Sequence, residues 1–93
     1  LKGYLKGRRL MGMIADDSEE YAKITVYNTI KNGDELVYIG KDFLKHNDNR
    51  FKLFIKTEEN EFVEVDNIRN VDNAYIKSSV HNFKKYDIIT IEE

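Results

Sequence analysis

The sequence predicts an all-β fold, and within that class a small closed Greek-key barrel of about six or seven strands. Three observations lead to this prediction. Runs of about five to eight β-favouring residues follow one another at short spacing, no segment carries a long helical periodicity, and the chain contains no proline. A barrel is favoured over a sandwich because closure removes the strand edges that a proline-free chain would otherwise expose.

Length and composition limit the chemistry. The chain has 93 residues, so residues 1–93 are expected to form a single domain with one core. It contains no cysteine, which excludes disulfides, thiolate zinc sites and thiol nucleophiles. The net charge of −2 gives no overall attraction for nucleic acid, and DNA is not expected as a partner. No cofactor is expected either.

Two features bear on the protein's context. No apolar run approaches the roughly 20 residues of a membrane span, and no signal-peptide pattern opens the chain, so we expect a cytoplasmic location and no membrane partner. The sequence begins at Leu1 rather than Met, and it is interpreted as a domain excised from a larger protein. Residues 1–9, with Arg8 and Arg9 and no acidic side chain, are expected to be a flexible basic lead-in.

The strands are predicted from period-two alternation and from the turn residues between them. In the second strand, Ala22, Ile24 and Val26 suit the core. Gly12 in the first strand marks a bulge or a close approach of two backbones. The expected strands span residues 10–15, 21–28, 35–39, 51–57, 61–65, 74–80 and 87–92.

Two connections are expected to be irregular. Residues 41–50 read as a polar loop with one helical turn, ended by the HNDN run at 46–49. Residues 67–73 read as a loop anchored in the core by Ile68 and Val71.

The stretch TIKNGDELVYIG, residues 29–40, is the best-defined turn. Gly33 accepts a positive φ at little cost, and Asp34 can hydrogen-bond the neighbouring backbone before the strand at 35–39 begins. The pattern apolar-Lys-x-x-Asp-x-aliphatic of residues 30–36 returns 53 residues later at 83–89, where Asp87 holds the place of Asp34. Both segments are therefore interpreted as equivalent barrel corners.

Motifs for catalysis are absent. The sequence has no G-x-G-x-x-G, no Walker loop, no H-E-x-x-H and no nucleophile elbow. His46 and His81 fall in expected turns and are interpreted as solvent-facing loop residues rather than metal ligands. The carboxylates of residues 58–66 and 16–20 are interpreted as solvated hairpin tips. No catalytic and no metal-ligating residue is predicted.

One candidate contact surface remains. Lys52, Phe54 and Lys56 alternate on the expected outward face of one strand, an aromatic ring between two cations. Arg8 and Arg9 extend this surface if the first strand lies nearby. Such a face fits an interface with another protein domain, and it also fits an RNA-binding platform.

Residues 29–40 resemble the corner motif of the β-barrel that forms the second domain of translation elongation factors. In that motif an aliphatic residue, a short spacer, Gly-Asp and an aliphatic strand ending in Gly recur. The matching positions here are Ile30, Gly33, Asp34, Leu36 and Gly40. The resemblance implies a fold rather than a function.

A longer similarity covers about residues 10–92 and is tightest at 21–40. Gly12-Met13-Ile14, the run YAKITV at 21–26, Asn28 and GDEL at 33–36 resemble the C-terminal barrel of one peptidase family. That family is the collagenase-like family thirty-two among the peptidases of unknown catalytic type. KYDII at 85–89 is similar to its last turn and strand, whereas residues 64–73 lack the proline usual there, so the resemblance does not predict the register of 58–75.

The resemblance implies a non-catalytic C-terminal domain that docks on the N-terminal catalytic domain of its parent protein and helps to bind a protein or peptide substrate. No catalytic residue of the family maps onto this chain. Related members of the family act in the hydroxylation of tRNA. The alternative expectation is therefore a tRNA-binding barrel of a tRNA-modification protein.

Overall fold

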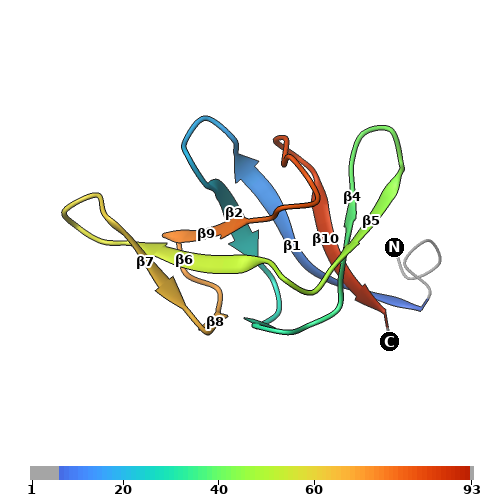
Figure 1. Cartoon of the computed structure of the whole chain (residues 1–93), viewed down its shortest axis with the longest axis horizontal. Helices are drawn as coiled ribbons and strands as arrows, with labels where there is room; N and C mark the ends of the chain where they lie inside the picture. The colour runs from blue at the N-terminus through green and yellow to red at the C-terminus, as the bar shows by residue number, and fades with distance from the viewer. Residues whose placement is uncertain (1–6, 93) are drawn as a thin grey trace.

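The computed structural model describes residues 7–92, which form ten β-strands in two sheets (Figure 1). The predicted all-β class is confirmed, and no helix occurs among the described residues. The strands are β1 Arg8–Asp16, β2 Ala22–Val26, β3 Ile30–Lys31, β4 Leu36–Ile39, β5 Lys45–Asp48, β6 Lys52–Lys56, β7 Phe62–Val65, β8 Asn67–Ile68, β9 Ala74–Lys77 and β10 Ile88–Glu92.

The main sheet is antiparallel and curls into a half-barrel. Its strand order is β5-β4-β10-β1-β2-β9-β6-β7, so β5 and β7 are its two edges (Figure 1). A separate two-stranded ribbon pairs β3 with β8. The architecture predicted from the sequence is therefore met in part, because the sheet has eight strands rather than six or seven and is curled with two edges.

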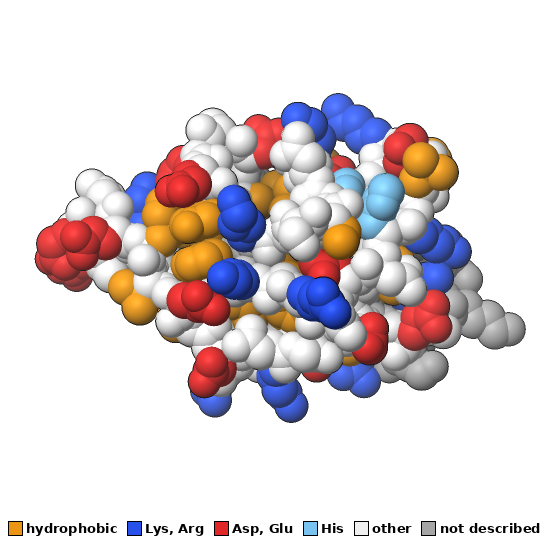
Figure 2. Space-filling view, viewed as in Figure 1, with side chains coloured by type: hydrophobic (Ala, Val, Ile, Leu, Met, Phe, Trp, Pro, Cys, Tyr) orange, Lys and Arg blue, Asp and Glu red, His pale blue; other side chains and the backbone are white. Residues whose placement is uncertain are grey.

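The outside of the molecule is strongly charged. Lys, Arg, Asp and Glu side chains are spread over the face seen in Figure 2. Within residues 7–92 no helix is long and apolar enough to span a membrane.

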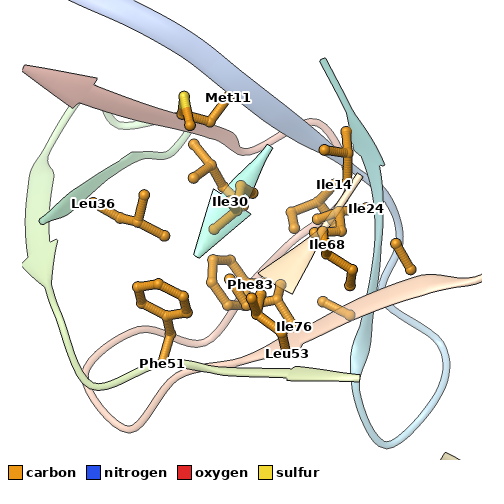
Figure 3. Close-up of a cluster of buried hydrophobic side chains, with 14 of the residues drawn as sticks. Met11, Ile14, Ile24, Ile30, Leu36, Phe51, Leu53, Ile68, Ile76 and Phe83 are labelled. Atoms are coloured by element: carbon orange, nitrogen blue, oxygen red, sulfur yellow. The ribbon is translucent and has the colours of Figure 1, made fainter. Parts of the chain in front are cut away.

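The core fills the concave side of the sheet. Ile30 from β3 and Ile68 from β8 lie opposite each other in the ribbon, and both are fully buried against side chains of the main sheet (Figure 3). Burying a side chain of this size stabilises the fold by about 1.5–3 kcal/mol, so the short ribbon contributes to stability through its apolar side chains. The predicted alternation of β2 is confirmed, since Ala22, Ile24 and Val26 are all buried.

Gly12 has both of the roles that the sequence suggests. The pairing of β1 with β10 shifts register between Leu10 and Gly12, which is the signature of a bulge. On its other side, a Cβ on Gly12 would lie 2.8 Å from the backbone oxygen of Thr25 in β2. Only glycine lets the two strands approach this closely.

Replacing Gly12 with Ala is expected to lower the free energy of unfolding by about 2 kcal/mol, because the added methyl group meets backbone rather than a flexible side chain. Urea denaturation monitored by circular dichroism measures this. Gly40→Ala is the control, since its Cβ would meet atoms no closer than 3.4 Å, an ordinary contact. Equal losses in the two variants would contradict the close-approach explanation.

Three sequence predictions need correction. Residues 41–50 contain no helical turn. Instead Lys45–Asp48 form β5, which pairs with β4 and includes most of the HNDN run. Val71 is 38% exposed and does not anchor its loop, although Ile68 does. Arg8 and Arg9 belong to β1 rather than to a flexible lead-in, and residues 1–6 of that segment lie outside the described residues.

The two repeated segments form the same turn. Asp34 accepts a hydrogen bond from the backbone N–H of Lys31 at 2.9 Å, and its own N–H donates to the Lys31 carbonyl at 3.1 Å. In the second copy Asp87 makes the equivalent bonds with Lys84 at 2.9 and 3.0 Å. The residue before each Asp has a positive φ, +89° at Gly33 and +79° in the second copy. The two turns lead into β4 and β10.

β4 and β10 are neighbours with a symmetric register. Val37 faces Thr90 at the centre, Leu36 faces Ile91 and Tyr38 faces Ile89. A shift of 53 residues exchanges the two strands and leaves this pairing unchanged. The antiparallel pairing also places the end of β4 beside the turn that precedes β10, and this arrangement positions the site described next.

Candidate functional site

Two loops meet at one end of the half-barrel. Residues 40–44 connect β4 with β5, and residues 81–87 precede β10. Because Ile39 pairs with Ile88, the two loops lie side by side and flank one groove. We call these two loops the loop end.

Asp87 holds the second loop in place. Its carboxylate is 2% exposed and accepts a hydrogen bond from the N–H of Lys84 at 2.9 Å; its Oδ2 also lies 2.8 Å from Nε2 of His81. The backbone joins the same loop to β1, since Ile14 exchanges hydrogen bonds of 2.9 Å with Tyr86 and Asp87. The loop is therefore fixed to the sheet through side chain and backbone together.

The two histidines stack on each other. The ring centroids of His46 and His81 are 4.9 Å apart, and His81 also contacts the rings of Tyr38 and Phe83. The interpretation as two solvent-facing loop residues is wrong: His46 lies in β5, and both rings are partly buried. β5 and the second loop bring together residues that are 35 positions apart in the sequence.

A second buried carboxylate, that of Asp48, lies next to Tyr38. Asp48 accepts hydrogen bonds from the Tyr38 hydroxyl and the Ser78 hydroxyl at 2.8 Å each, and from the N–H of Arg50 at 2.9 Å. Burial and the adjacent Asp48 carboxylate raise the pKa of Tyr38 far above its ordinary value. Tyr38 is thus a permanent hydrogen-bond donor to Asp48.

The carboxylates of Asp87 and Asp48 connect neighbouring loops and strands. Asp87 contacts Lys84 and His81, and Asp48 accepts hydrogen bonds from Tyr38 and Ser78. Among residues 7–92, no group of three or more His, Cys, Asp or Glu side chains is placed to hold a metal ion.

The loop end exposes large apolar side chains. Phe43 in the first loop is 82% exposed and Tyr86 in the second is 62% exposed; Leu44 in the first loop is also exposed. Figure 2 shows the histidines beside hydrophobic side chains at the end where β4 and β5 lie. Phe43 has a φ of +61° and Tyr86 a φ of +79°, a backbone region that bulky residues rarely adopt. Among residues 7–92, these positive-φ positions therefore carry the most exposed aromatic rings.

The predicted contact surface is only partly assembled. Lys52, Phe54 and Lys56 share the outer face of β6, as expected. Phe54, however, is 7% exposed, because the ring of Tyr21 stacks on it at 4.1 Å. Lys56 forms an ion pair of 2.8 Å with Glu19, and this hydrogen bond raises the pKa of Lys56.

Arg8 and Arg9 do not join that surface. Both lie at the start of β1, opposite the end of β10, and β2 and β9 separate β1 from β6. Arg8 forms an ion pair of 3.5 Å with Glu92. Sequence reasoning missed Tyr21, the residue that covers the predicted aromatic.

The residues of the corner motif take structural positions. The side chains of Ile30 and Leu36 are buried in the core, and Gly33 and Asp34 form the turn between them. Gly40 directly follows β4, and a Cβ on it would lie 3.4 Å from the carboxylate of Asp87 in the second turn.

Comparisons of the chain with protein-family models, with curated proteins and with solved structures returned no match.

Proposed function

We propose that this domain is a non-catalytic accessory module that docks through its loop end on the catalytic domain of a collagenase-like, family thirty-two peptidase and helps it to bind a protein or peptide substrate. The assignment of the docking surface rests on two exposed aromatic residues, Phe43 and Tyr86, which lie on adjacent loops and both have a positive φ. The choice of partner rests on the sequence resemblance.

The energetics of the loop end favour a binding role. A non-glycine residue at positive φ costs about 1–2 kcal/mol, and an exposed aromatic ring gains no burial energy in return. Asp87 and the backbone bonds to Ile14 hold the second loop in this conformation. A partner that covers both rings would gain their hydrophobic area without ordering a mobile loop, which lowers the entropic cost of binding.

A second resemblance bears on the fold. The likeness to the second domain of the elongation factors, with a closed Greek-key barrel, stays a prediction. The curled sheet and the turn at Asp34 support it.

Calorimetric titration of this domain with a separately expressed family thirty-two catalytic domain tests the proposal. We expect saturable binding with a negative heat-capacity change, because apolar surface is buried at the loop end. Failure of the two domains to associate would contradict the proposed function.

Tyr86→Gly separates a binding role from a folding role. Glycine adopts the φ of +79° without strain. The free energy of unfolding of the variant is therefore expected to be about 1 kcal/mol higher than that of the unmutated domain. The same change removes an exposed ring and is expected to weaken binding to the catalytic domain. Urea denaturation and the titration measure the two effects. Unchanged or tighter binding would show that Tyr86 is not a contact residue.

A further inference from the structure

A second groove lies on the outer face of the sheet, apart from the loop end. It runs over β6 and β9, and its walls include Tyr21 and Phe54 together with Arg50, Lys52 and Lys77. In Figure 2 hydrophobic side chains appear where β6 and β9 lie, with Lys or Arg beside them. None of these lining residues belongs to the two loops of the loop end.

The charges in this groove are not balanced within the chain. Lys52 in β6 lies directly opposite Lys77 in β9, and like charges in this position destabilise a sheet. Neither these two lysines nor Arg50 forms an ion pair in the described part of the chain. Glu64 is the one carboxylate among the described lining residues, so the groove keeps a positive excess.

The aromatic wall is rigid. The rings of Tyr21 and Phe54 are parallel, 4.1 Å apart and inclined by 4°. The rings of Phe62 and Tyr21 are nearly perpendicular, with their centroids 4.7 Å apart. Tyr21 is itself partly exposed, and the Lys77 ammonium lies 5.6 Å from its ring centroid. A stacked pair of rings and one cation are therefore placed together, with Lys52 opposite Lys77 on the neighbouring strand.

We propose that this groove binds single-stranded nucleic acid, with a base against the Tyr21 ring and phosphates at Arg50, Lys52 and Lys77. Any of the bases can stack on an aromatic ring. The phosphates of the nucleic-acid backbone would supply the negative charges that Lys52 and Lys77 do not find within the chain. The ligand class follows from this charge complementarity together with the exposed ring. The site differs from the surface predicted from the sequence, since Lys56 is paired with Glu19 and the Arg8 end lies elsewhere.

Fluorescence anisotropy with a labelled single-stranded oligouridylate tests the proposal at several ionic strengths. The double variant K52A/K77A is expected to bind about tenfold more weakly and to show a smaller salt dependence, because each lost phosphate contact lowers the slope by about 0.7. It is also expected to melt at a higher temperature, since the like-charge pair is gone. The matched control K41A/K84A removes the same charge from the loop end and should bind as the parent domain does.

Two further variants test the aromatic wall and the remaining acid. Tyr21→Leu keeps Phe54 covered but removes the stacking ring, and it is expected to weaken binding about tenfold. Glu64→Gln is expected to tighten binding. Absence of binding by the parent domain at low ionic strength overturns the proposal. So does an equal loss in K52A/K77A and K41A/K84A, because net charge rather than the groove would then account for the affinity.

Discussion

Replacing Asp87 with Ala is expected to lower the free energy of unfolding by about 3 kcal/mol. The carboxylate is almost fully buried and accepts the Lys84 N–H, with His81 Nε2 at 2.8 Å. Hydrogen bonds to a charged acceptor are worth about 1.5–3 kcal/mol each. Urea denaturation monitored by circular dichroism gives the change directly.

The first copy of the turn supplies the matched control. Asp34 makes the same backbone bonds with Lys31, but it is more exposed and no histidine lies against it among the described residues. Asp34→Ala is therefore expected to cost about 1 kcal/mol. Losses of equal size at the two positions would contradict the explanation from burial and from His81. A loss below that of Asp34→Ala would contradict the anchoring role of Asp87.

The double replacement of Phe43 and Tyr86 by Ala is expected to weaken binding to the family thirty-two catalytic domain by about 100-fold or more. Truncating a buried aromatic contact commonly costs 2 kcal/mol or more, and each factor of ten corresponds to about 1.4 kcal/mol. The isolated domain should lose little stability, because both rings are exposed in it. Calorimetric titration measures the affinity, and thermal unfolding measures the stability.

Tyr27→Ala provides the comparison for this variant. Tyr27 is also an exposed aromatic, but it follows β2 and lies outside both loops of the loop end. We expect its replacement to leave the affinity unchanged. Equal weakening of binding by Tyr27→Ala and by the double variant would show that the loop end is not the docking surface.

The part of the fold that could be predicted from the sequence is the part governed by neighbouring residues. Period-two alternation places Ala22, Ile24 and Val26 in the core, because a strand turns successive side chains to opposite faces. The turn at Gly33 follows from the φ that glycine alone adopts freely. The repeat at residues 83–89 predicts the second turn, even though Tyr86 replaces the glycine at the positive-φ position.

The rest depends on contacts between strands that are distant in the sequence. β5 consists of polar residues with weak β preference, and it forms a strand because β4 offers it a pairing edge. His46 and His81 meet only through that pairing and the second loop. Phe54 points outward, as the alternation along β6 predicts. It is nevertheless buried, because the ring of Tyr21, which directly precedes β2, stacks on it. No local pattern encodes which ring covers it.

The two proposed surfaces make independent predictions. The loop end exposes two aromatic rings at positive φ, and it is proposed to bind protein. The outer groove is cationic and contains an aromatic stack, and it is proposed to bind nucleic acid. Variants of one surface therefore serve as controls for the other. The K52A/K77A variant should bind the catalytic domain with the same affinity as the unmutated domain.

Hydrogen exchange of this domain, alone and with the family thirty-two catalytic domain, tests the docking surface most directly. We predict that the backbone amides of residues 40–44 and 81–87 become protected in the complex, since both loops would be covered. The outer face of β6 and β9 should exchange unchanged. Protection confined to that outer face, or no protection anywhere, would contradict the account.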